Sequence, residues 1–133
     1  MTKEKILLVD DDEWLLNLYG ERLKLEGFEV VTATNGHDGY ELVITEKPDL
    51  ILTDVVMSNG DGFYLLDKIR SNHDFGHIIV ICLTNLASSH DFEELENAGA
   101  NGILVKADYT PTQAVDKIKQ MLDKIKKDAL PEK

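Results

Sequence analysis

The sequence predicts an α/β fold, in which a doubly wound sheet of five parallel strands is covered by five helices. Short apolar runs that suit buried strands alternate with longer segments whose apolar residues recur at helical spacing. The strands are expected over residues 5–9, 28–33, 50–52, 78–83 and 103–105. Because strands that alternate with helices across short connections are parallel, the helices are expected on both faces of the sheet.

Each expected helix has a start or stop signal of its own. The signals are Gly27 after the first helix, Asn35 before the second, Asp61-Gly62 before the third, Ser88 and Ser89 before the fourth, and Thr110-Pro111 before the fifth. The first helix, over residues 13–26, has an apolar arc made of Leu15, Leu18, Tyr19, Leu23 and Leu25. The second should run to about residue 46, the third through Arg70 and the fourth to Gly99, and the fifth carries an apolar stripe from Ala114 to Ile125.

The length predicts a single domain, residues 1–133, with a core over about residues 5–127 and a loose tail over residues 129–133. The lone cysteine, Cys82, lies inside an apolar run, so we interpret it as a buried hydrophobe in a reducing compartment. No stretch approaches the length of a membrane span, and the first residues lack the features of a signal peptide. We therefore expect a cytoplasmic protein with no membrane contact.

The chain is acidic, with a net charge of -11 and a pI near 4.6. An acidic surface repels the phosphates of nucleic acids and anionic lipids. The small basic cluster Lys124, Lys126 and Lys127 suits a solvated helix end and does not reverse this balance. The composition therefore predicts no direct binding to nucleic acid.

Polar residues follow four of the expected strands at one edge of the sheet. Asp10 and Asp11 follow the first strand, Asp54 the third, Thr84 the fourth and Lys106 the fifth. The flavodoxin-like order 2-1-3-4-5 makes the first and third strands neighbours, and open α/β sheets bind ligands at this edge. Three adjacent carboxylates need a cation to stay ionised, and oxygen ligands suit Mg²⁺. The sequence thus predicts a magnesium site at Asp10, Asp11 and Asp54.

The same edge has the parts that phosphoryl transfer requires. A metal ion, the Lys106 ammonium and the Thr84 hydroxyl would surround an incoming phosphoryl group with charge and hydrogen-bond donors. Asp54, on the central strand, is then the expected nucleophile, and its attack yields an acyl phosphate. Each residue alone has a plainer interpretation: Lys106 as a surface lysine, Thr84 as a turn residue and, in our preferred view, Asp12 as a helix N-cap. The four histidines are expected to be surface or packing residues: His37, His73, His77 and His90.

These motifs resemble the receiver domain of two-component response regulators. They are Ile6-Leu7-Leu8-Val9-Asp10-Asp11, Asp54-Val55-Val56-Met57 with Asp61-Gly62 downstream, then Thr84 and Lys106, and the resemblance covers nearly the whole chain. It implies that Asp54 is the phosphoacceptor, that Asp11, Asp54 and the Val56 carbonyl bind Mg²⁺, and that Asp10 assists through water. It also implies that Thr84 and Lys106 contact the phosphoryl oxygens.

The resemblance implies partners as well. The phosphoryl donor is expected to be the phosphohistidine of a sensor histidine kinase or a phosphotransfer protein. Phosphorylation is expected to repack the face made of the fourth helix, fifth strand and fifth helix, where a downstream protein target would bind. The domain is expected to be a monomer or weak dimer, and to catalyse only its own phosphorylation and dephosphorylation. Whether it stands alone or belongs to a larger regulator stays open.

Five positions depart from the family pattern. Ser58 stands where Pro is usual and Gly60 where a large apolar residue is usual, which favours a more mobile loop after Asp54. Asn85 replaces a small residue beside the site, and Ile103 replaces the aromatic that commonly moves on phosphorylation. Ala107 replaces a Pro that follows a cis bond, so we predict a trans Lys106–Ala107 bond.

Other classes of function were weighed against these residues. The departures favour a degenerate receiver that serves as an interaction module without phosphorylation, whereas the complete Asp, Thr and Lys set opposes it. A hydrolase similar to the haloacid dehalogenases needs a second Asp two residues after its nucleophile, where Val56 stands. A flavodoxin-like cofactor binder is opposed by the three carboxylates, which would repel a flavin phosphate.

Overall fold

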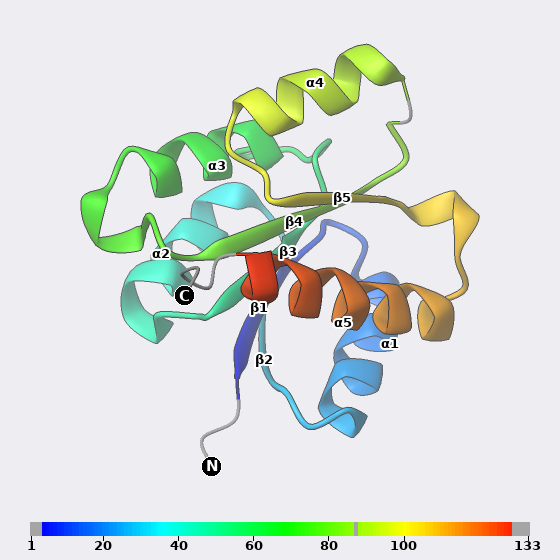
Figure 1. Cartoon of the computed structure of the whole chain (residues 1–133). Coiled ribbons are helices and arrows are strands. Elements are labelled where there is room, and N and C mark those ends of the chain that lie inside the picture. Colours follow the sequence, from blue (N-terminus) through cyan, green and yellow to red (C-terminus); the bar gives the residue numbers. More distant parts are fainter. Residues whose placement is uncertain (1–3, 87, 129–133) are drawn as a thin grey trace.

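The structure is a computed structural model that describes residues 4–86 and 88–128 (Figure 1). Its strands are β1 (Lys5–Val9), β2 (Glu29–Ala33), β3 (Leu50–Thr53), β4 (Ile79–Thr84) and β5 (Gly102–Val105). Its helices are α1 (Glu13–Leu25), α2 (Gly36–Glu46), α3 (Gly62–Arg70), α4 (Ser89–Asn97) and α5 (Pro111–Asp128), with short 3-10 helices η1 (His73–Phe75) and η2 (Lys106–Asp108). The predicted α/β alternation is confirmed, while the predicted tail lies outside the described residues.

The five strands form one parallel sheet in the order β2-β1-β3-β4-β5, as predicted. β1 and β3 are neighbours, with Val9 paired with Thr53, and β4 and β5 are neighbours, with Thr84 paired with Val105. The strands therefore end almost level with one another. The residues that follow them meet at one edge of the sheet.

Helices cover both faces of the sheet and divide the core into two layers. Successive strand residues point to opposite faces, so Ile6 and Leu8 pack with α1 and α5 whereas Leu7 and Val9 pack with α2, α3 and α4. Figure 1 shows α1 beside α5 on one side of the sheet. These fully buried strands explain why the runs are apolar at consecutive positions instead of alternating.

The buried face of α1 differs from the expected arc. The helix buries Leu16, Tyr19, Gly20 and Leu23, whereas the Leu25 side chain is 79% exposed. The buried residues recur at intervals of three and four, which is one face of a helix, and Leu25 lies two residues beyond Leu23 on the opposite side. The expectation that Leu25 shares the apolar arc is therefore wrong, and Leu16 belongs there instead.

Element ends agree with the capping signals to within one or two residues. α4 ends at Asn97, short of the expected Gly99, because Ala98 is the C-cap and Gly99 has φ +107°. At the start signal of α5, Thr110 and Gln113 form a capping box: the Gln113 amide donates to Thr110 Oγ1 at 3.2 Å, and the Thr110 amide donates to Gln113 Oε1 at 3.0 Å. None of the helices in the described ranges is long and apolar enough to cross a membrane.

Candidate functional site

Asp10 and Asp54 are held at the sheet edge by backbone bonds that continue the strand ladders. The Asp54 amide donates to the Val9 carbonyl at 2.8 Å, and the Asp10 amide donates to the Ala33 carbonyl at 3.2 Å. Gly62 packs behind Asp54, where a Cβ atom would lie 2.8 Å from the Asp54 carbonyl oxygen. The start of α3 can therefore approach the Asp54 backbone only because residue 62 is a glycine.

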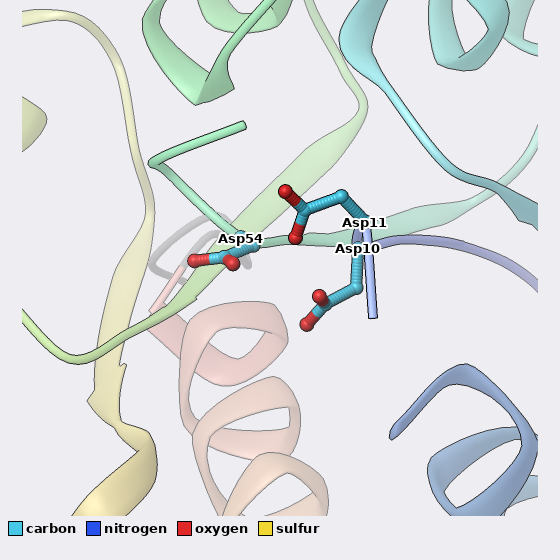
Figure 2. A group of neighbouring side chains, drawn as sticks. All are labelled: Asp10, Asp11 and Asp54. Carbon is cyan, nitrogen blue, oxygen red and sulfur yellow. The ribbon is translucent and has the colours of Figure 1, made fainter. Parts of the chain in front are cut away.

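The structure brings the three predicted carboxylates together. Figure 2 shows Asp10 and Asp11 next to Asp54, and one oxygen from each residue lies within 4.8 Å of the other two. Asp10 is buried, Asp54 is partly buried and Asp11 is exposed, so the cluster is open to solvent on the Asp11 side. One oxygen of Asp10 accepts a hydrogen bond from the Asp12 amide at 2.9 Å, which orients that carboxylate.

Lys106 reaches the same cluster from β5. Its Nζ lies 2.6 Å from Asp10 Oδ2 and 3.2 Å from Asp54 Oδ2, and its side chain is only 11% exposed. Burial favours the neutral amine, but the hydrogen bond to Asp10 and the charges of Asp54 and Asp10 outweigh it and raise the Lys106 pKa. The ammonium is therefore locked in its charged form, with two carboxylates as its partners.

The Asp54 carboxylate has an environment of its own. Burial raises its pKa, the charge of Asp10 acts in the same direction, and Lys106 opposes both. Its Oδ1 accepts a hydrogen bond from the Val55 amide at 2.7 Å, while Oδ2 faces Lys106. The carboxylate is thus oriented at both oxygens, and its raised pKa makes it a more basic group than an exposed aspartate.

Thr84 lies at the end of β4 with 1% of its surface exposed. Its Oγ1 accepts a hydrogen bond from the Leu86 amide at 3.1 Å. A hydroxyl that accepts one bond still has its own proton to donate. In the described part of the chain Thr84 forms no hydrogen bond with the carboxylate cluster, so only its position at the shared edge agrees with the predicted arrangement.

The loop after Asp54 is tied to α2, a connection that the sequence analysis missed. The Gly36 amide donates to the Gly60 carbonyl at 2.7 Å, and the His37 amide donates to the Asn59 carbonyl at 3.2 Å. These are amides of the first turn of α2, which have no partner inside the helix. Gly60 has φ +94°, and a Cβ atom there would clash with Tyr64 at 2.9 Å. A glycine at this position therefore allows the loop to attach to α2. These bonds oppose the loop mobility that Gly60 suggested.

Other residues that the sequence singled out lie around the cluster or in the core. Asp12 caps α1, since its side chain accepts hydrogen bonds from the Trp14 and Leu15 amides at 3.0 and 3.3 Å. The Lys106–Ala107 bond is trans, as predicted.

Cys82 is buried, and burial raises its pKa to about 12, so it is an inert thiol. The Val56 side chain is 66% exposed beside Asp54. None of the four histidines belongs to the carboxylate cluster.

The donor set fits a hard divalent cation. It consists of carboxylate oxygens, with no nitrogen or sulfur ligand in the cluster that the described residues form. One oxygen from each of the three carboxylates lies within 4.8 Å of the other two, so these side chains are close enough to hold one small cation between them. The three carboxylates also outnumber the single Lys106 ammonium, so a dication would neutralise the excess charge.

A hollow of about 610 Å³ adjoins the Asp11 side of the cluster. It is lined by Asp11, Asp12, Glu13, Trp14, Thr34, Asn35, Ser58 and Asn59. Trp14, the single tryptophan of the chain, is 68% exposed at this hollow. The cluster can therefore be reached from solvent on this side.

Comparisons with known proteins point to one family. The family model of the response regulator receiver domain matches residues 6–119. The chain is 32% identical over 128 residues to a probable transcriptional regulator ycf27 of Guillardia theta, which covers 96% of this chain and 49% of that protein. The chain thus spans about half the length of the first curated relatives that it matches.

Solved structures show the same fold. A response regulator receiver domain protein of Methanospirillum hungatei is 30% identical, with a TM-score of 0.82 over 96% of this chain and all of that one (100%). The chemotaxis response regulator CheY4 of Vibrio cholerae is 27% identical, with a TM-score of 0.83 over 90% of this chain and 99% of that one.

Proposed function

Because the chain belongs to the response regulator receiver domain family, we propose that it is a signalling switch that accepts a phosphoryl group on Asp54. The observation that carries the proposal is the cluster itself: three carboxylates within 4.8 Å of one another, with the Lys106 ammonium 3.2 Å from Asp54. In this geometry one carboxylate can act as the nucleophile while the other charged groups stabilise the transferred group.

In the proposed reaction a carboxylate oxygen of Asp54 attacks the phosphorus of a phosphohistidine. An oxygen–phosphorus bond forms and the phosphorus–nitrogen bond breaks. The bonding electron pair returns to the ring nitrogen, so the donor histidine leaves as neutral imidazole when its other ring nitrogen carries a proton. Burial raises the pKa of the Asp54 carboxylate and makes it more basic, while the nearby Lys106 favours its ionised form. Lys106 and the Thr84 hydroxyl proton are proposed to stabilise the phosphoryl oxygens.

Asp10, Asp11, Asp54 and the Val56 carbonyl are the groups proposed to hold Mg²⁺. When bound, the ion would reduce the repulsion between the carboxylate and the incoming phosphoryl group. Asp10 already has Lys106 as a partner at 2.6 Å, which supports a role through water in place of direct ligation. Asp11 is exposed and has no such partner among the described residues, so it is the carboxylate most available to the ion.

The test is labelling by acetyl phosphate with Mg²⁺, which needs no partner protein. Asp54→Asn should abolish the label, because a carboxamide is not a nucleophile, and circular dichroism should show an unchanged fold. The matched control is Asp49→Asn, since Asp49 lies at the opposite edge, where its Oδ2 accepts from the Lys5 amide. Undiminished labelling of the Asp54 variant would refute the assignment.

The proposed partners follow from the family. A sensor histidine kinase or phosphotransfer protein would supply the phosphoryl group in the cytoplasm, and a protein target would bind the face formed by α4, β5 and α5. We propose no direct nucleic-acid contact for this domain, although its curated relatives are named transcriptional regulators. The net charge of -11, with Asp91, Glu93, Glu94 and Glu96 on α4, supports a protein target. We propose that the domain catalyses only its own phosphorylation and dephosphorylation.

The second candidate is an interaction module that works without phosphorylation. Ile103 on β5 favours it, because a branched aliphatic side chain replaces the aromatic of the usual switch. The discriminating measurement is a titration with beryllofluoride and Mg²⁺, followed by the fluorescence of Trp14 beside Asp11. A saturable change supports the switch, and no change together with no acetyl phosphate labelling supports the module.

A further inference from the structure

A side chain joins the loop that follows Thr84 to the loop that contains Lys106. The Ala107 amide donates a hydrogen bond to Asn85 Oδ1 at 3.1 Å. Thr84 and Val105 form the last pair of the β4–β5 ladder, so this bond lies immediately beyond the end of the paired strands. It extends the connection between β4 and β5 through the two loops at the phosphoryl site.

Asn85 satisfies an amide that has no local partner. η2 begins at Lys106, and its N-cap residue, Val105, provides no side-chain hydrogen bond. The first amides of any helix lack partners within that helix, so they need an outside acceptor. Asn85 supplies this acceptor from a loop 22 residues away along the chain, and therefore caps η2 from outside. The bond exists only because residue 107 has an amide hydrogen, which a proline would lack.

The bond joins the two residues proposed to contact the phosphoryl oxygens. Asn85 directly follows Thr84, whose hydroxyl is held by the Leu86 amide at 3.1 Å. Ala107 directly follows Lys106, whose Nζ is held by Asp10 and Asp54. Fixing one loop to the other limits how far the Thr84 hydroxyl and the Lys106 ammonium can move apart. A site whose donors are placed in advance binds its ligand with a smaller loss of entropy.

We propose that Asn85 is a positioning residue for the phosphoryl site, which sets the spacing between Thr84 and Lys106 through the Ala107 amide. The inference rests on the proposed function, because it assigns Asn85 to the same site. One contact then accounts for two departures from the family pattern, Asn85 and Ala107. The side-chain oxygen of Asn85 is the acceptor, and the Ala107 amide, which a proline would lack, is the donor.

The test is a double-mutant cycle read by beryllofluoride binding with Mg²⁺, followed by Trp14 fluorescence. Asn85→Ala removes the acceptor and Ala107→Pro removes the donor. Each should raise the half-saturating beryllofluoride concentration about threefold to tenfold, the range expected for one hydrogen bond. The double variant should bind beryllofluoride no more weakly than the weaker-binding of the two single variants, because both changes remove the same hydrogen bond. Ala107→Gly, which keeps the amide hydrogen, should bind like the unmodified chain.

Asn72→Ala is the matched control for a purely structural effect. Asn72 also caps a 3-10 helix: as the residue directly before η1, it accepts a hydrogen bond from the Asp74 amide at its Oδ1 at 2.9 Å, and η1 precedes β4 at the far edge of the sheet. Asn72→Ala should lower the melting temperature about as much as Asn85→Ala while leaving beryllofluoride binding unchanged.

Two outcomes would overturn the inference while the proposed function stands. In the first, Asn85→Ala binds beryllofluoride like the unmodified chain. In the second, the double variant raises the half-saturating concentration by the product of the two single increases. If the unmodified chain neither binds beryllofluoride nor is labelled by acetyl phosphate, the proposed function fails and the role of Asn85 fails with it.

Discussion

The two edges of the sheet handle buried charge in opposite ways. At the carboxyl ends of the strands, Lys106 faces Asp10 and Asp54, and Asp11 adds a third carboxylate. At the amino ends, the acceptors that the partly buried Arg70 has among residues 4–86 and 88–128 are all neutral: the carbonyls of Gly99, Gly76 and Ile78, and Asn101 Oδ1. The carboxyl edge leaves an excess of negative charge, whereas hydrogen bonds to neutral groups satisfy the Arg70 cation at the amino edge. The first arrangement suits a cation and a phosphoryl group, and the second stabilises the fold.

Removing Lys106 should produce the largest effect on the reactive edge. Lys106→Ala leaves Asp10, which is 4% exposed, without its ammonium partner, so we expect a loss of about 3 kcal/mol in the free energy of unfolding. Labelling by acetyl phosphate should fall about 100-fold, because a donor to the phosphoryl oxygens is lost. Urea denaturation and a labelling time course measure the two effects.

Lys119→Ala is the control for this variant. Lys119 also forms an ion pair, with Glu26 at 2.9 Å, but the Lys119 side chain is 43% exposed and the pair joins α5 to the end of α1, away from the site. We expect unchanged labelling and little change in the melting temperature. Equal labelling by the Lys106 and Lys119 variants would contradict the role given to Lys106.

Removing Arg70 should lower the free energy of unfolding but leave the labelling unchanged. Arg70→Met takes away the donors of four hydrogen bonds, and we expect a loss of about 2 to 4 kcal/mol in the free energy of unfolding. Labelling of the folded fraction should not change, since the site is at the other edge. Arg70→Lys, which keeps the charge without the planar fork, should recover only part of the stability. A labelling defect as large as that of Lys106→Ala would show that the edges are not independent.

The same contrast explains how much the sequence could predict. Asp10, Asp11, Asp54 and Lys106 were identified because each lies within two residues of the end of a strand, and the end of a strand is visible as the end of an apolar run. The order of the sheet then placed these residues together. The fold and the reactive cluster therefore follow from local patterns combined with one rule of topology.

The contacts that were missed join segments far apart in the sequence. Arg70 lies 29 residues from Gly99, and no pattern in the sequence linked the end of the third helix to that position. The attachment of Gly60 to α2 and of Asn85 to Ala107 depends on loop geometry that no periodicity encodes. Leu25 was misplaced because an apolar residue in the last turn need not face the core.

Magnesium should stabilise the reactive edge by a smaller amount. An ion at ten times its dissociation constant adds about 1.4 kcal/mol to the free energy of unfolding if it binds only the folded chain. Asp11→Asn should remove this gain, and because Asp11 is exposed, the variant should otherwise unfold like the unmodified chain. Thermal denaturation with and without Mg²⁺ measures the gain, with Asp49→Asn as the control. An equal gain in both variants would exclude Asp11 as a ligand.

The smallest expected effect is a pH-dependent gain of stability in Asp54→Asn. Burial, reinforced by the charge of Asp10, raises the pKa of Asp54 in the folded chain above its ordinary value of 3.8. The folded state then binds this proton more tightly than the unfolded state, so stability falls as the pH rises from 3.8 through the folded pKa. At neutral pH the ionised Asp54 therefore destabilises the fold, and its replacement by the neutral amide should raise the melting temperature at pH 7. Below pH 3.8, where the carboxyl is protonated in both states, the difference should disappear.

Melting curves from pH 3 to pH 8 test this prediction. They are recorded without Mg²⁺, because a bound dication would remove the repulsion. A variant that is less stable than the unmodified chain at pH 7 would mean that the bonds from Lys106 and the Val55 amide outweigh burial, and that this edge is organised for stability in the same way as the edge around Arg70.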